Sequence, residues 1–236
     1  MGSLKKLSQI GTRTLARARA LKKIEPVAGD LPKEILHQTV AEWANEMMKI
    51  VGVEVKGNTP DLTTPAIYVG NHISYLDIPI LFTKAPVVFV AKKELLSWPI
   101  IGNGMRRVRT VTVERDSKDS RANISAAIVP MIKEKHQSVA IFPSGTTTQF
   151  EEKPWRWGAF RIAYENQIPV IPFRLTYRPL RASAYLLEDT FFPHLLKLLK
   201  HEKIEATVEF HPPVQITHIE SDTKKWWHWS KPGDGG

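Results

Sequence analysis

The sequence predicts an α/β fold with a mostly parallel central sheet, flanked by helices and preceded by an N-terminal helical hairpin. From about residue 51 onward, short runs rich in β-branched residues alternate with helical patterns, an order typical of parallel α/β sheets. Several of these runs are apolar throughout, which indicates strands buried on both faces. The chain of 236 residues is also long enough to bury a hydrophobic core.

Residues 1–50 are predicted to form the hairpin. On a helical wheel of residues 4–23, the apolar side chains share one arc and nearly all basic ones lie opposite. This pattern is typical of a helix in a membrane interface, and equally of a helix packed on the core with a solvated basic face. A break is expected at residues 25–30. A second helix is expected from Pro32 to about Ile50, capped by Asp30.

Residues 51–230 are predicted to form the α/β domain, and residues 231–236 a disordered tail. Strands are expected at residues 51–55, 66–69, 87–91, 108–113, 138–142, 170–177 and 206–210. Helices are expected near residues 74–83, 93–98, 120–135, 155–165 and 193–200.

The net charge of +9 is concentrated at the N-terminus. Residues 1–24 hold seven lysines and arginines and no acidic residue, so they carry +7 of the total. A protein that coats nucleic acid uniformly is therefore not favoured, and no recognition motif accompanies the basic helix. The absence of cysteine excludes disulfides, thiolate metal sites and cysteine nucleophiles. No apolar stretch approaches the ~20 residues of a membrane span, and no secretory signal is recognised.

A strand, a polar turn and a helix start follow one another around His72. The carboxyl end of a strand is where α/β sheets usually bind ligands. His72 is a candidate general base, because its ordinary pKa lies near neutrality, and Asp77 could orient its imidazole. Five residues is the wrong spacing for one helix face, so the pair can meet only if His72 lies in the turn. Alternatively, Asp77 only caps the helix in a capping box with Ser74, and His72 is a surface residue.

A second buried strand runs into a small polar turn at Ser144, Gly145 and Thr146. Backbone N–H groups and hydroxyls in such a turn could hold a phosphate or an oxyanion. An ordinary strand-ending turn is the alternative.

Four ordered elements resemble the glycerolipid (1-acylglycerol-3-phosphate) acyltransferases. Residues 71–77 match the motif Asn-His-x4-Asp, and residues 111–115 match a strand ending in arginine. Residues 142–147 match Phe-Pro-Glu-Gly-Thr-Arg except that Ser144 and Thr147 replace the glutamate and the final arginine. The remaining matches are an apolar strand with proline at residues 168–172 and two shorter segments at residues 91–95 and 157–160.

The resemblance implies an O-acyltransferase of phospholipid biosynthesis or remodelling. It would move an acyl group from acyl-CoA or acyl-carrier protein to the free hydroxyl of a lysophospholipid, with no metal and no other cofactor. His72 would take the proton of the hydroxyl, and Asp77 would orient His72. The acceptor phosphate would pair with basic side chains, where charge-assisted hydrogen bonds are strongest. The substrate-binding residues implied are Lys92, Arg115, Ser144, Gly145 and Thr146.

The two departures in the third motif leave the acceptor open. It is 1-acylglycerol-3-phosphate, or a lysolipid with a larger or different head group such as an aminolipid. The basic N-terminal helix further predicts a membrane surface with anionic lipid as partner, with the protein peripheral or monotopic on the cytoplasmic face. A non-catalytic protein of the same fold that binds anionic membranes is the alternative function.

Overall fold

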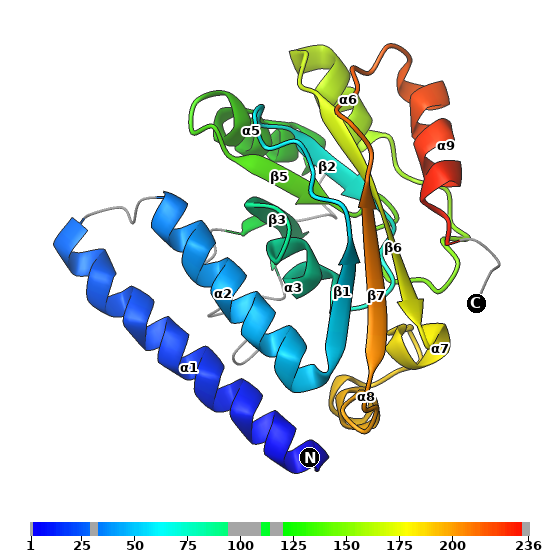
Figure 1. Cartoon of the computed structure of the whole chain (residues 1–236). Coiled ribbons are helices and arrows are strands. Elements are labelled where there is room, and N and C mark those ends of the chain that lie inside the picture. The colour runs from blue at the N-terminus through cyan, green and yellow to red at the C-terminus, as the bar shows by residue number, and fades with distance from the viewer. Residues whose placement is uncertain (1, 29–32, 94–109, 114–119, 233–236) are drawn as a thin grey trace.

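A seven-stranded sheet forms the centre of the molecule (Figure 1). The computed structural model describes residues 2–28, 33–93, 110–113 and 120–232. The strands are β1 (Val53–Gly57), β2 (Ile67–Gly70), β3 (Val87–Lys92), β4 (Val111–Val113), β5 (Ser138–Ile141), β6 (Val170–Arg178) and β7 (Ile204–Phe210). Their order is β1-β7-β6-β2-β5-β3-β4, and every neighbouring pair is parallel except β6 and β7. The predicted mostly parallel α/β sheet is confirmed.

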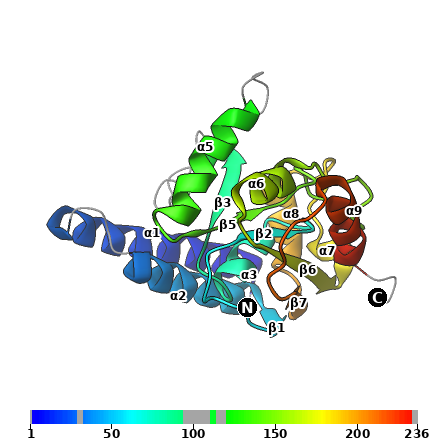
Figure 2. The same ribbon diagram turned by 90° about the horizontal axis from the view of Figure 1, so that it is seen from above.

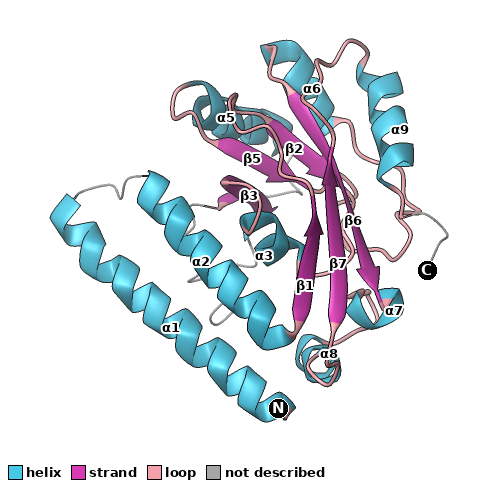
Figure 3. Ribbon diagram, viewed as in Figure 1, coloured by secondary structure: helices cyan, strands magenta, loops and turns pink. Residues whose placement is uncertain are grey.

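Helices cover both faces of this sheet, as Figures 2 and 3 show. They are α1 (Ser3–Ala28), α2 (Lys33–Val51), α3 (Asp77–Phe82), α5 (Ser120–Lys133), α6 (Gly158–Asn166), α7 (Leu180–Ser183), α8 (Phe191–Leu198) and α9 (Ile219–Ser230). Strand β2 supplies side chains to two cores, because neighbouring residues of a strand point to opposite faces. Tyr68 packs with α2, α3 and α8, whereas Ile67 and Val69 pack with α5, α6 and α9.

The two N-terminal helices differ in how they meet the sheet. Helix α2 buries a full apolar face, which includes Val40, Ala44 and Met48, in the same core as the sheet. Helix α1 lies on the outer side of α2 (Figure 1). Within the described ranges, no helix is long and apolar enough to cross a membrane.

Part of the basic charge of α1 is engaged inside the molecule. The ammonium of Lys6, only 8% exposed, donates to the carbonyls of Val51 (3.0 Å) and His201 (3.2 Å). Val51 is the last residue of α2, where a cation also interacts favourably with the helix dipole. Two further ion pairs join α1 to α2, Arg13–Glu46 at 3.1 Å and Arg17–Glu42 at 2.8 Å.

The predicted apolar arc of α1 is divided between two environments. Leu7 and Ile10 pack against the core. Leu4 and Leu15 are 75% and 53% exposed, so they are available to a partner outside the molecule. The structure therefore shows the core packing of α1 for part of the arc, and the membrane interface stays a prediction for the exposed leucines.

Two expectations differ from the structure. The break expected at residues 25–30 is wrong in part, since α1 continues through Pro26 to Ala28. No helix was predicted for α9, whose start is held by Asp222 Oδ2 accepting from the N–H groups of Thr217 (2.9 Å) and His218 (3.0 Å).

Several other expectations lie wholly or mostly outside the described residues. They are the Asp30 cap and Pro32 start of the second helix, the helix at 93–98, the first part of the strand at 108–113, and the tail from 233 onward.

Candidate active site

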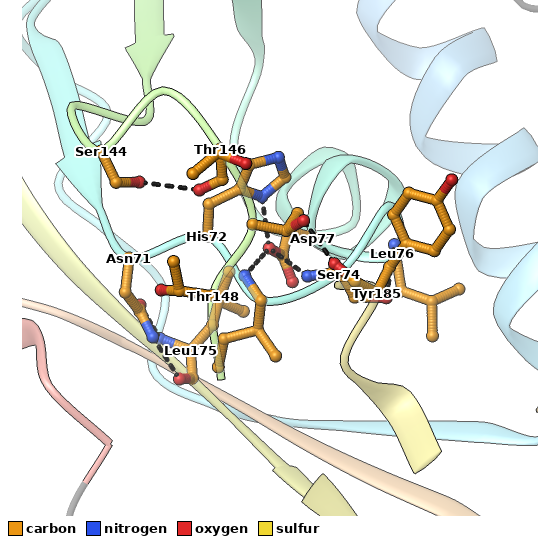
Figure 4. Close-up of polar contacts among 12 residues, drawn as sticks. Asn71, His72, Ser74, Leu76, Asp77, Ser144, Thr146, Thr148, Leu175 and Tyr185 are labelled. Atoms are coloured by element: carbon orange, nitrogen blue, oxygen red, sulfur yellow. Dashed lines mark hydrogen bonds and ion pairs between the residues drawn. The ribbon is translucent and has the colours of Figure 1, made fainter. Parts of the chain in front are cut away.

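Asn71 determines where the chain leaves the sheet. Strand β2 is buried along its whole length and ends at Gly70. The side chain of the next residue, Asn71, makes the two hydrogen bonds that a strand backbone would make with β6. Its Nδ2 donates to Leu175 O (2.8 Å), and its Oδ1 accepts from Leu175 N (2.7 Å) (Figure 4). This double contact with β6 replaces a ladder pair, so the chain turns out of the sheet at His72.

His72 and Asp77 meet as their spacing required. His72 lies in the turn, and Asp77 is the first residue of α3. The distance from His72 Nδ1 to Asp77 Oδ2 is 2.7 Å (Figure 4). A carboxylate only accepts hydrogen bonds, so Nδ1 carries the proton and Nε2 keeps the lone pair that a general base needs. The imidazole is 18% exposed and the carboxyl is fully buried.

Asp77 also holds the turn before α3, although the helix has no side-chain cap at its N-cap residue Leu76. The same Oδ2 atom accepts from the backbone N–H groups of Ile73 (2.7 Å) and Ser74 (3.0 Å). On its other oxygen, Asp77 accepts from the hydroxyl of Tyr177. Burial and the neighbouring Asp77 raise the pKa of Tyr177, so this hydroxyl remains a donor. One carboxylate therefore holds the turn and orients His72.

The strand β5 brings a second loop against His72. The ring of Phe142 stacks on the imidazole, with centroids 3.9 Å apart and planes 11° apart. The N–H of Thr148 donates to the carbonyl of His72 at 2.8 Å. These contacts join the strand ends of β2 and β5, which are neighbours in the sheet.

The small residues of this loop form a tight turn. Gly145 has φ of +74°, a conformation that favours glycine, and its N–H donates to Phe142 O at 3.0 Å. Ser144 is buried, and its hydroxyl donates to Thr146 O at 3.0 Å (Figure 4). Thr147, at the other departure from the third motif, donates its hydroxyl to Tyr185 O. The turn therefore brings Ser144, Gly145 and Thr146 to the loop that holds His72.

A shallow hollow of about 250 Å³ opens beside this turn. Its wall is mixed in character, because hydroxyls and charged groups lie beside leucine and phenylalanine side chains. The lining residues are Thr146, Thr147, Thr148, Gln149, Phe150, Glu152, Lys153, Leu186, Leu187 and Glu188.

The two predicted basic contacts are not placed by the structure. Lys92 ends β3, but its side chain lies outside the described set, as does all of Arg115. The backbone register pairs Lys92 with Val113, so the ends of β3 and β4 lie side by side. Within the described residues, no group of three or more histidines and carboxylates is arranged to hold a metal ion.

Sequence reasoning missed Glu151, a fully buried acid that accepts from the backbone N–H of His72 (3.2 Å) and from Trp155 Nε1 (2.7 Å). Burial raises the pKa of Glu151, although its hydrogen bonds oppose the shift. The sequence alone does not distinguish Glu151 from the adjacent acid Glu152, and only the structure shows that Glu151 is buried and Glu152 exposed. Two tryptophans of α9 also contact the interior: Trp226 is 3% exposed, and Trp227 Nε1 donates to Glu151 O at 2.9 Å.

Comparisons with known proteins identify the relatives of this chain. A family model described as Acyltransferase matches residues 51–176. The lyso-ornithine lipid O-acyltransferase of Pseudomonas aeruginosa is 30% identical over 167 residues, which are 69% of this chain and 63% of that protein. The 1-acyl-sn-glycerol-3-phosphate acyltransferase of Neisseria gonorrhoeae is 26% identical over 158 residues, 66% of this chain and 62% of that protein. The chain thus spans less than two thirds of either relative.

The fold has a counterpart among solved structures. The crystal structure of the 1-acyl-sn-glycerophosphate acyltransferase PlsC from Thermotoga maritima superposes with a TM-score of 0.63 at 19% identity. The match covers 94% of this chain and 85% of that one, which shows a shared fold. Because the family model spans more than half of the sequence and includes His72 and Asp77, the chain belongs to the Acyltransferase family.

Proposed function

We propose that this protein is a lysolipid O-acyltransferase. The observation that carries the proposal is the pairing of a partly exposed His72 with a fully buried Asp77 at the carboxyl edge of the sheet, 2.7 Å apart. A buried carboxylate on Nδ1 leaves Nε2 as the proton acceptor and stabilises the imidazolium that forms. The family membership supports the same class of reaction.

The proposed reaction needs one base and no covalent intermediate. His72 Nε2 removes the proton of the lysolipid hydroxyl while the hydroxyl oxygen attacks the thioester carbonyl. The new C–O bond forms an ester, the C–S bond breaks, and the proton held by His72 passes to the leaving thiolate. General-base catalysis of this kind contributes about 10²–10⁴-fold to a rate.

The acceptor is either 1-acylglycerol-3-phosphate or a lysolipid with another head group. Both types of activity occur in the names of the relatives. Lys92 and Arg115 are proposed to bind a phosphate, while Ser144, Gly145 and Thr146 bind substrate at the turn. Thr147 supplies no cation where the third motif has arginine, and its hydroxyl is engaged by Tyr185. This loss favours an acceptor that requires less positive charge than a phosphate monoester.

We also propose that α1 binds the protein to an anionic membrane surface. Leu4 and Leu15 are exposed on this helix, as are the cations Lys5 and Arg19. Attraction to anionic lipid is worth about 1 kcal/mol for each basic residue near the surface. Because Lys6, Arg13 and Arg17 contact the protein itself, they contribute less to this attraction than their charge alone suggests.

A lysolipid-by-donor matrix tests the function. Purified protein is mixed with acyl-CoA or acyl-carrier protein and with lysophosphatidic acid, lysophospholipids or a lyso-aminolipid, and diacyl products are measured by mass spectrometry. Product from at least one pair, lost in His72→Ala, is expected. Vesicle binding without turnover in any pair would instead support the non-catalytic membrane-binding alternative.

A further inference from the structure

Glu151 is a buried acid with an unfavourable backbone conformation. It is 0% exposed, and its backbone has φ of +52°, a region that side-chain-bearing residues rarely adopt. Both features cost free energy, so the surrounding contacts must hold the residue in place. Its Oε1 accepts from Trp155 Nε1 at 2.7 Å, and its Oε2 accepts from the N–H of His72 and the hydroxyl of Thr148, both at 3.2 Å.

The segment from Phe142 to Glu151 holds His72 at three points. Phe142 stacks on the face of the ring, Thr148 donates to the carbonyl, and Glu151 accepts from the N–H. Asp77 holds the ring from its Nδ1 side. The orientation of the imidazole is therefore determined jointly by Asp77 and by this segment.

The contacts of Glu151 require an acid rather than an amide. A backbone N–H and an indole N–H are both donors only, and they face different oxygens of the carboxyl. A glutamine would place its own NH₂ against one of these donors in either orientation.

We propose that Glu151 is a positioning residue, which holds the His72 peptide so that the imidazole keeps its alignment between Asp77 and the acceptor hydroxyl. This inference rests on the proposed acyl transfer. A displacement of about 1 Å in a catalytic group can cost about 10²-fold in rate. Loss of alignment should lower kcat and leave KM nearly unchanged, because the binding surfaces for donor and acceptor are retained.

The test compares Glu151→Gln with wild type and with Glu165→Gln, which changes an exposed acid on α6. Two readouts are used: kcat and KM for the best pair of the lysolipid-by-donor matrix, and hydrogen–deuterium exchange of the peptide that contains residues 70–77. Glu151→Gln is expected to lower kcat by roughly tenfold or more, with KM within about twofold. Faster exchange is expected at the His72 amide, and Glu165→Gln should match wild type in both readouts.

A second variant covers the case in which Glu151→Gln does not fold. Trp155→Phe keeps the aromatic ring and removes the donor to Oε1, so kcat should fall about threefold and exchange should rise. A folded Glu151→Gln or Trp155→Phe protein with wild-type kcat, or with wild-type exchange at residues 70–77, overturns the proposal. Absence of turnover in wild type refutes the acyl transfer instead, and the exchange data still decide whether Glu151 holds His72.

Discussion

Replacing Asp77 by asparagine is expected to lower kcat about a thousandfold. Asp77 is fully buried, and its Oδ2 lies 2.7 Å from His72 Nδ1. His72 becomes positively charged in the proposed reaction, and this charge is stabilised by the carboxylate. Two unit charges about 4 Å apart attract by about 4 kcal/mol at an effective dielectric constant of about 20. Since about 1.4 kcal/mol corresponds to a factor of ten in rate, loss of the charge costs about 10³.

The asparagine variant is expected to remain folded. Its side-chain oxygen can take the place of Oδ2 and accept from the N–H groups of Ile73 and Ser74. Its NH₂ group then faces the hydroxyl of Tyr177, which can accept as well as donate. The substitution therefore removes the charge while it preserves the hydrogen-bond geometry.

Steady-state kcat with a lysolipid and a thioester donor measures this effect, and circular dichroism confirms the fold. Tyr177→Phe is the matched control, since it removes the hydroxyl at Oδ1 and keeps every contact of Oδ2. Its loss of kcat should stay below about tenfold, as expected for one hydrogen bond. A folded Asp77→Asn protein with kcat within about threefold of wild type would refute the electrostatic role assigned to Asp77.

Three further predictions concern stability. Burial raises the pKa of Glu151 above its ordinary 4.5, so the folded protein binds this proton more tightly than the unfolded chain. The free energy of unfolding should therefore fall as pH rises from about 4.5 to the raised pKa. Denaturation experiments across this pH range should show the fall in wild type and not in Glu151→Gln. Gly70→Ala should cost about 1–3 kcal/mol of unfolding free energy, because a Cβ would lie 2.2 Å from the Phe173 ring. In a double-mutant cycle, Phe173→Leu should relieve part of this loss of stability. Additive losses from the two substitutions would contradict the clash as the cause. Lys6→Met should lower the melting temperature, because about 1–3 kcal/mol of hydrogen bonding is lost. Lys5 is exposed, so Lys5→Met should leave the melting temperature unchanged. Equal melting temperatures of the two variants would argue against the buried role of Lys6.

Much of the candidate site was accessible from sequence because its groups lie close along the chain. The five-residue spacing required His72 in the turn and Asp77 in the first helical turn, and both residues are found there. One oxygen atom of Asp77 accepts from the Ser74 N–H, which is the contact that a capping box would make, and the same atom binds His72. Glu151 could not be recognised in this way. It and Glu152 are adjacent acids, and only the packing of α6, α9 and the β5 loop distinguishes the buried one.

The sequence by itself determined the alternation of strands and helices and the buried character of the central strands. These follow from local periodicity, because side-chain direction repeats every two residues in a strand and every 3.6 in a helix. Only the tertiary structure decided that β7 lies antiparallel beside β6, that Lys6 is buried, and that Glu151 holds His72. Each of these depends on groups at least 25 residues apart in the chain, whose contact is selected by packing rather than by any local pattern.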